Sequence, residues 1–548
     1  MQKRKVKVRR ALLGRERNEP KANTMMISQL FDKIAAQAAS RTTVAAAVTT
    51  AVVAFVGVHT AQQRKLTRKL GRFPRSSPWF FPHLDLFRAI RAGFGPTLII
   101  SRRAALGDIF YLGPFPGMKR PLLTICKPED QAELMKKEGR MKLYAQMPDE
   151  MLATHGPGNM QIQSGKNHQF LRKIFSSLLS PSALESFVPY IVDAFTKLWT
   201  DLETKSKESD HPINIQDAIC DAQFTLMCKL FFGLTPDADD ADLAQMRCDF
   251  EAQMDSHFKP ASSPIYKKGV EAANRIHKFL SERFDSVLEE RRKKYQSDYS
   301  AEEKKDDSGE GSMPKVGNAL ESIADALLRD SVANDPKAIS DVKDNLNLLL
   351  EASHGTTMTI TTSTMYFLNR TDNVDALDNL RHEVANLENA SYSTLRGEMP
   401  YAEGCIKEAM RLAPIVGGVS FTMDEGLDVS FKGEHLKGPT TFLLTFSANY
   451  KDDSLFPEPE TYEPERWIKG STKEASAAAQ LAFKPFGTGR HLCLGYQLAL
   501  LVMKTSLYVF AKDERRTIKF DEESVKIENG LFPEAKVSGG LPGHILRV

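Results

Sequence analysis

The chain has 548 residues, of which 42% are hydrophobic and 26% are charged, so it is long and apolar enough to fold around a large core. The formal net charge is only +3, and no basic stripe with interleaved aromatic residues occurs, which argues against binding to nucleic acid. The six cysteines contain no Cys-x-x-Cys pair, so neither a zinc site nor a disulfide framework is expected.

The N-terminal part consists of three segments that precede a folded body. Residues 1–41 are basic, and residues 1–15 contain no acidic side chain. Residues 42–63 carry no Asp, Glu, Lys or Arg and match the roughly 20 residues that a transmembrane helix needs. Residues 64–82 are basic and Pro-rich, which is typical of a hinge on the cytoplasmic side of an anchor. We therefore expect a membrane-associated enzyme, in the endoplasmic reticulum, with residues 42–63 as its anchor.

Two alternatives to this anchor stay open. A basic start with few acids is also typical of a transit peptide, which would direct the chain to a plastid or a mitochondrion. Residues 42–63 are rich in Ala and Thr, so they also fit an ordinary buried helix that follows a disordered tail.

Residues 83–548 are predicted to form the folded body, mainly α-helical with a minor β-sheet region. Apolar periodicity predicts one long helix at residues 341–369, capped by Ser340, and further helices at 373–387 and 399–412. Short apolar runs predict strands at residues 109–112, 122–125 and 441–446. Residues 296–318 have few hydrophobic side chains and are expected to form a disordered, solvated loop.

A loop near the C-terminus carries the clearest chemical signal. Residues 486–495 read F-G-T-G-R-H-L-C-L-G and lead into an amphipathic helix at 494–512. This pattern suits a thiolate ligand to haem iron, because Gly489 and Gly495 permit a tight turn and a close approach of the backbone. Phe486 can shield the sulfur from water, and the start of the helix would stabilise negative charge on Cys493. The alternative is a free cysteine buried in a glycine-containing loop.

This loop resembles the haem-binding loop of the cytochromes P450. The resemblance implies the cytochrome P450 fold, a haem b cofactor, and Cys493 as the axial ligand of its iron. It also implies that His491 reaches a haem propionate. Glu408 and Arg411 resemble the Glu-x-x-Arg pair of the family, and Arg466 in Pro-Glu-Arg-Trp resembles its third member, a buried network that supports the cysteine loop.

Two further segments resemble family motifs that contact the haem. His168 and Arg172, in G-K-N-H-Q-F-L-R-K, lie where the family usually has Trp-x-x-x-Arg, which implies that both bind a propionate. An exposed basic helix face is the alternative. Residues 351–357 read E-A-S-H-G-T-T, and Thr356 matches the threonine that the family uses in oxygen activation.

The acid that precedes this threonine in the family is missing, because Gly355 stands in its place. We therefore form the hypothesis that His354 replaces it as the titrating group. A threonine inside a helix also often bonds only the carbonyl four residues before it, which is the alternative for Thr356.

The resemblance implies a haem-thiolate monooxygenase that inserts one oxygen atom from O₂ into an apolar substrate. G-P-G-N-M-Q-I-Q-S-G and R-L-A-P-I-V-G-G are similar to the branch of retinoic-acid hydroxylases, brassinosteroid hydroxylases and sterol demethylases, which indicates an isoprenoid-derived lipid. Electrons would come from an NADPH–cytochrome P450 reductase or a ferredoxin. One alternative is an isomerase or lyase that rearranges a lipid hydroperoxide without a reductase. Another is a haem-binding protein without turnover.

Overall fold

The computed structural model describes residues 57, 73–75, 96–112, 120–141, 144–145, 149–257, 259, 261–302, 317–513, 515–529 and 535–547. The basic segment 1–41 lies outside them, as do all of 42–63 except Gly57 and all of 64–82 except 73–75. Within the described part of the chain, no helix has the length and apolar character that crossing a bilayer requires.

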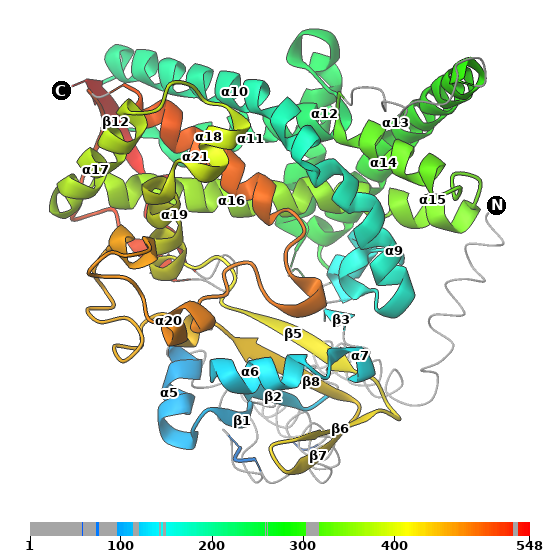
Figure 1. The fold of residues 1–548 in the computed structure, drawn as a ribbon, viewed down its shortest axis with the longest axis horizontal. Coiled ribbons are helices and arrows are strands. Elements are labelled where there is room, and N and C mark those ends of the chain that lie inside the picture. The colour runs from blue at the N-terminus through cyan, green and yellow to red at the C-terminus, as the bar shows by residue number, and fades with distance from the viewer. Residues whose placement is uncertain are drawn as a thin grey trace, which may run out of the picture.

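Helices make up most of the molecule and fill the upper part of Figure 1. The first half of the chain contains α5 (Pro96–Leu106), α6 (Pro128–Met135), α7 (Glu138–Met141), α8 (Asp149–His155), α9 (Gly165–Ser176), α10 (Pro181–Glu208), α11 (Ile215–Phe232), α12 (Pro236–Ser256) and α13 (Pro264–Glu302). The second half contains α14 (Ala319–Arg329), α15 (Pro336–Lys343), α16 (Leu346–Leu368), α17 (Val374–Ala385), α18 (Tyr392–Gly397), α19 (Pro400–Leu412), α20 (Ala477–Ala482) and α21 (Tyr496–Ala511).

A five-stranded sheet lies below the helices in Figure 1, in the order β1-β2-β8-β5-β3. Its strands are β1 (Ile109–Leu112), β2 (Leu122–Ile125), β3 (Tyr144–Ala145), β5 (Gly418–Met423) and β8 (Thr440–Thr445). Within this sheet β2 and β8 pair in parallel, and the other neighbouring strands pair antiparallel. β1 and β2 have the predicted bounds, and β8 begins and ends one residue before its prediction.

Three smaller sheets contain the remaining strands. They pair β6 (Asp428–Phe431) with β7 (Glu434–Lys437), β10 (Ile527–Asn529) with β11 (Ala535–Val537), and β12 (Pro542–Arg547) with both β4 (Ile213–Asn214) and β9 (Arg516–Phe520). The prediction of a mainly helical body with a minor sheet region is thus confirmed.

The prediction of a single helix at residues 341–369 is wrong, because α15 and α16 are separate helices. Asn345 donates from Nδ2 to the Asp341 carbonyl at 2.7 Å, which is the oxygen that a continuing helix would use for a backbone bond. Asn and Asp side chains that bond backbone groups in this way compete with helix formation. Ser340 is not the cap either, because α15 begins after Asp335, whose side chain accepts from the Lys337 N–H.

The other predicted helices lie close to their observed bounds. α17 and α19 each differ from their predictions by at most two residues. α13 continues to Glu302, into the segment where a loop is expected, and residues 303–316 lie outside the described residues.

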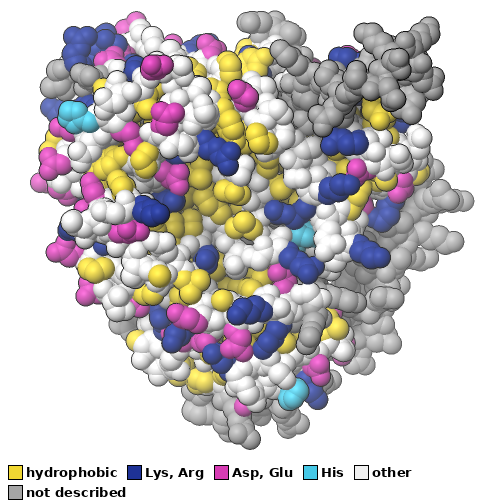
Figure 2. All heavy atoms as spheres, in the orientation of Figure 1, with side chains coloured by type: hydrophobic (Ala, Val, Ile, Leu, Met, Phe, Trp, Pro, Cys, Tyr) yellow, Lys and Arg dark blue, Asp and Glu magenta, His cyan; other side chains and the backbone are white. Residues whose placement is uncertain are grey.

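α16 runs through the middle of the helical part and is the element around which the core assembles (Figure 1). It packs against α11, α19 and α21. Most of its side chains after Thr357 are buried. Hydrophobic side chains also gather over the centre of the face seen in Figure 2, where the helical part meets the sheet.

A glycine inside α19 generates the first prediction. An ideal Cβ on Gly404 would lie 2.7 Å from the backbone oxygen of Pro464, whereas one on Gly397 meets nothing within 4 Å. Helix propensity alone would make alanine the more stable residue at Gly404 by about 1 kcal/mol. We expect Gly404→Ala instead to lower the free energy of unfolding by about 1–3 kcal/mol, because the backbone must move apart. Thermal unfolding, with Gly397→Ala as the matched control, measures this. Equal stability of the two variants would contradict it.

Candidate functional site

The cysteine loop, residues 486–495, is held closed by its own backbone. The Cys493 N–H donates to the Phe486 carbonyl at 2.9 Å, and the 3₁₀ helix η6 (Gly489–His491) lies between them. Gly489 has φ +69°, and an ideal Cβ there would lie 2.5 Å from Met135 Cε. Glycine is therefore required at this position by both conformation and contact. Gly495, by contrast, has nothing within 4 Å of its ideal Cβ, so protein contacts do not require it.

Cys493 presents an accessible thiol at the end of this loop. Desolvation raises the pKa of this thiol, and the Gly495 N–H and the charge of Arg172 oppose the rise only in part. The Gly495 N–H at the start of α21 thus favours the negative charge on Cys493, as we expect, but burial outweighs it. A bound metal cation would produce the thiolate, because it deprotonates a coordinating thiol. Phe486 is half-buried, and its ring centroid lies 6.0 Å from that of Tyr496.

Basic side chains from α9 lie against the cysteine loop. The rings of His168 and His491 have centroids 4.1 Å apart, and Arg172 donates from Nη1 to the Leu492 carbonyl at 2.6 Å. Burial and the neighbouring charges of His491, Arg172 and Arg490 lower the pKa of His168 to about 4, so His168 is neutral at pH 7. The structure thus brings together three residues that the sequence predicts as haem contacts, His168, Arg172 and His491.

These basic side chains fit the propionates of a haem. Burial lowers the pKa of Arg172, and among the residues that the structure describes no carboxylate forms an ion pair with its guanidinium. A half-buried guanidinium without a carboxylate is a ready partner for one, since Arg binds such groups in a bidentate manner. The Glu138 carboxylate lies 3.9 Å from His491 Nε2 and accepts from the Arg490 N–H at 3.0 Å. A thiol with a cationic rim is a donor set that suits haem.

A buried ion network joins α19 to the chain that leads to the cysteine loop. Arg411 donates to both carboxylate oxygens of Glu408 at 2.8 and 3.0 Å, and Arg466 donates to one of them at 3.1 Å. Trp467 donates from its indole N–H to the other at 2.9 Å. Glu408 and Arg411 have no exposed surface, so each charge depends on the others. The structure therefore brings the predicted trio together.

The face of α16 that contains Thr356 is open. Ala352 is exposed in the middle of the helix, and an ideal Cβ on Gly355 meets nothing within 4 Å. The Thr356 hydroxyl donates to the Ala352 carbonyl at 2.8 Å, which is the local bond that the alternative interpretation expects.

The side chain of His354 points toward α11. Its Nε2 lies 3.2 Å from the Cys220 carbonyl on α11, and its ring stands edge-on to Phe224 and Phe250. Successive helical residues point about 100° apart, so His354 lies on a different face of α16 from Thr356. His354 therefore does not occupy the place of the missing acid.

Sequence reasoning missed two residues of this site, Glu138 and Trp467. Trp467 directly follows Arg466 and shares its short 3₁₀ helix, so its position could have been inferred from the Arg466 motif. Glu138 is far from the cysteine loop in the sequence, and no pattern connects it to Arg490.

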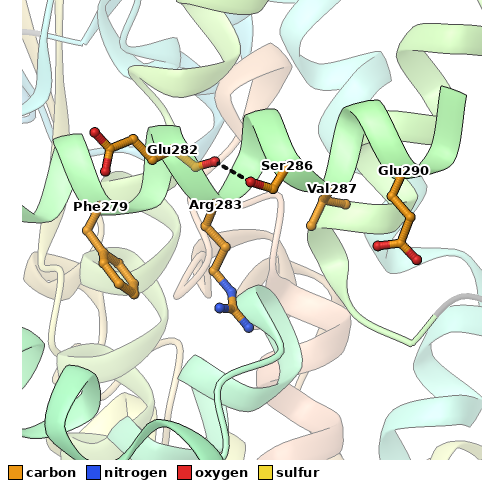
Figure 3. A pocket seen from close by; sticks show the side chains of 6 residues that line it. All are labelled: Phe279, Glu282, Arg283, Ser286, Val287 and Glu290. Carbon is orange, nitrogen blue, oxygen red and sulfur yellow. Dashed lines mark hydrogen bonds between the residues drawn. The ribbon is translucent and has the colours of Figure 1, made fainter.

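A separate depression runs along α13 and has a volume of about 430 Å³ (Figure 3). Phe279, Glu282, Arg283, Ser286, Val287 and Glu290 line it. The Arg283 guanidinium donates to the carbonyls of Phe232 and Gly233, and the Ser286 hydroxyl donates to the carbonyl of Glu282. The depression contains none of the residues described above.

The position of Arg172 against the cysteine loop generates the second prediction. We expect Arg172→Met to accelerate haem loss about tenfold or more, because a charge-assisted hydrogen bond to a propionate disappears. The measurement is the rate of haem transfer to an excess of an apo-globin acceptor. Lys173→Met is the matched control, since Lys173 is largely exposed and pairs with Asp330. If both variants lose haem at the same rate, Arg172 is not an anchor.

Comparison with known proteins places these features in a family. The family described as Cytochrome P450 matches residues 97–510. A cytochrome P450 monooxygenase, apf7 of Gibberella fujikuroi, is 29% identical over 42% of this chain, and the match spans 46% of that protein. The C-22 sterol desaturase erg5 of Aspergillus fumigatus is 25% identical over 69% of this chain and 74% of its own length. Cytochrome P450 26B1 of Xenopus tropicalis is 25% identical over 74% of each chain.

A solved structure has the same fold. Retinoic acid bound cyanobacterial CYP120A1 superposes with a TM-score of 0.66 at 21% identity, covering 84% of this chain and 96% of that one.

Proposed function

Because the chain belongs to the cytochrome P450 family and is a cytochrome P450 monooxygenase, we propose that its substrate is an isoprenoid-derived lipid, such as a sterol, a retinoid or a carotenoid fragment. The observation that carries this proposal is the open face of α16 at Ala352, Gly355 and Thr356, which has no charged side chain. An apolar wall of this kind suits a bulky hydrocarbon substrate. The names of the sterol desaturase and of the retinoic acid-bound structure support the same class.

The cofactor in this proposal is haem b, which binds O₂ and, once reduced, supplies the oxidising chemistry. Cys493 holds the iron, and Phe486 shields the sulfur from water. Arg172, His168 and His491 hold the propionates. Glu408, Arg411 and Arg466 keep the cysteine loop in position. The Thr356 hydroxyl donates to the Ala352 carbonyl and would hold a proton at Oγ1 on the substrate side of α16.

The enzyme needs an electron donor, as cytochromes P450 do. We propose an NADPH–cytochrome P450 reductase at the endoplasmic reticulum, with the chain tethered through residues 42–63. The uncharged stretch and the basic residues after it support this placement. A ferredoxin is the corresponding donor if residues 1–41 direct the chain to a plastid or mitochondrion.

A second candidate function follows from one specific observation. Gly355 stands where the family's acid is expected, and His354, which points toward α11, does not replace it. A reaction that needs no proton delivery, the rearrangement of a lipid hydroperoxide, would tolerate this loss.

One assay separates the two functions. We expect product from a sterol, retinoid or carotenoid only when NADPH, O₂ and a reductase are all present, with one oxygen atom derived from labelled O₂. The same purified protein is then incubated with lipid hydroperoxides in the absence of a reductant, and the products are analysed by mass spectrometry. Product only in this second incubation contradicts the monooxygenase proposal and supports the isomerase or lyase.

A further inference from the structure

The end of α8 and the turn that follows it lie tightly against α15 and the start of α16. We call residues 154–160 the strap. An ideal Cβ on Gly156 would lie 2.7 Å from the Asp344 carboxylate, and one on Gly158 would lie 2.8 Å from Asp341 Oδ1. The Gly158 N–H donates to Asp344 at 2.8 Å. Two glycines in the strap therefore permit a contact that side chains would prevent.

Asn345, in the break between α15 and α16, adds further contacts to the strap. Its Oδ1 accepts from the Met160 N–H at 2.7 Å, and its Nδ2 donates to the Gly158 carbonyl at 2.8 Å. One asparagine thus satisfies both a donor and an acceptor of the strap backbone. The C-terminal end of the strap is fixed where the chain turns, through η1 (Met160–Ile162), toward α9.

The N-terminal end of the strap is fixed by Glu351, the only acidic residue of α16. Its Oε2 lies 2.7 Å from His155 Nε2, accepts from Gln253 Nε2 at 2.9 Å, and lies 3.7 Å from His257 Nε2. His155 belongs to the strap, whereas Gln253 and His257 lie at the end of α12. One carboxylate therefore joins three segments that are distant in the sequence.

Glu351 carries its charge in this buried cluster. Burial alone would raise its pKa, but the hydrogen bond from His155 and the nearby imidazoles outweigh that effect, so the pKa of Glu351 lies below its usual value. The carboxylate is consequently ionised at neutral pH, and its bonds to His155 and Gln253 are charge-assisted. The cluster is not a metal centre, since no group of metal-ligating side chains in the described residues has a suitable arrangement.

The position of Glu351 connects the cluster to the active site. Glu351 directly precedes Ala352 and lies one helical turn before Gly355, so it borders the open face of α16. The strap leads into α9, which carries His168 and Arg172. The cluster therefore links the face on which the substrate would lie to the helix that holds the proposed haem anchors.

We propose that Glu351 is a positioning residue of the substrate chamber, which clamps the strap and the end of α12 to α16 and so holds one wall of that chamber. This inference rests on the proposed function, in that the open face of α16 is taken as the place where an apolar substrate binds. Glu351 acts through His155 and Gln253 and touches neither substrate nor cofactor. Without its charge, the strap and the end of α12 separate from α16 more often, and the chamber is less often competent to bind.

The first test is amide hydrogen exchange of the full-length haem protein, followed by mass spectrometry. We expect Glu351→Gln to increase the exchange rate of peptides that cover the strap about ten- to a hundredfold, because a charge-assisted buried contact is lost. Peptides from α19 keep their wild-type rates. Asp325→Asn is the matched control, because Asp325 is also a buried, paired carboxylate, but its partner is Arg291 and it lies on α14. Strap exchange that equals the wild type, or that rises equally in the control, overturns the clamp.

The second test separates a chamber wall from a merely structural contact. Clotrimazole serves as a bulky probe whose azole nitrogen binds ferric haem iron and whose body fills the space above it. We expect its dissociation constant to rise about tenfold in Glu351→Gln, because the competent conformation is less populated. An unchanged constant in a variant with a loosened strap means that the strap is not a wall of the chamber. The proposed substrate class can fail independently, because neither measurement uses a lipid.

A second variant protects the test against misfolding of the first. His155→Gln removes the strap side of the same contact, and we expect it to reproduce the exchange increase of Glu351→Gln. The double variant should exchange about as fast as the faster single variant, because both changes remove one interaction. Fully additive effects would show that Glu351 and His155 act separately, and the clamp would be wrong.

Discussion

The rest of the site depends on the hydrogen bonds that the fully buried carboxylate of Glu408 accepts. It accepts N–H groups from Arg411, Arg466 and Trp467, and the backbone N–H of Glu463 as well. Arg411 continues the network to the carbonyls of Tyr450, Pro459 and Thr461. A charge without access to water requires all of these partners, and removing one from such a pair costs about 3–5 kcal/mol. The network therefore fixes the long, irregular chain between α19 and the cysteine loop.

This chain leads to the cysteine loop, where Cys493 lies beside the basic side chains of His168, Arg172 and His491. Burial lowers the pKa of His168 most, and repulsion from the charges of His491, Arg172 and Arg490 lowers it further. Among the described residues, the Glu138 carboxylate lies 3.9 Å from His491. An anionic cofactor relieves this repulsion, so the site is stabilised by the group that it binds. On α16 the charged group is instead a carboxylate, that of Glu351, which binds the strap through His155. The two clusters are connected by the strap and α9, so cofactor binding and the chamber wall share one segment of chain.

Much of this arrangement could be predicted from the sequence because its signals are local. Each of these signals depends on residues that are close together in the sequence. They are the spacing of Gly489, Cys493 and Gly495, the strands β1 and β2, and the contact of Glu408 with Arg411. The break at Asp344 and Asn345 could not be predicted, because those side chains bond a strap that precedes them by almost two hundred residues. Glu138 was missed for the same reason. The direction of His354 could be predicted, because helical geometry alone places it on a different face of α16 from Thr356.

Ligation of haem iron by Cys493 is the central claim, and the absorption spectrum of the reduced carbon monoxide complex tests it most directly. A thiolate ligand pushes electron density onto the iron, so the wild-type protein should show the strongly red-shifted Soret band that this ligation produces. Cys493→Ser should lose that band, and Cys248→Ser, a change at an exposed cysteine on α12, should keep it. A wild-type spectrum without the red shift, or a red-shifted band that survives in Cys493→Ser, would contradict the account.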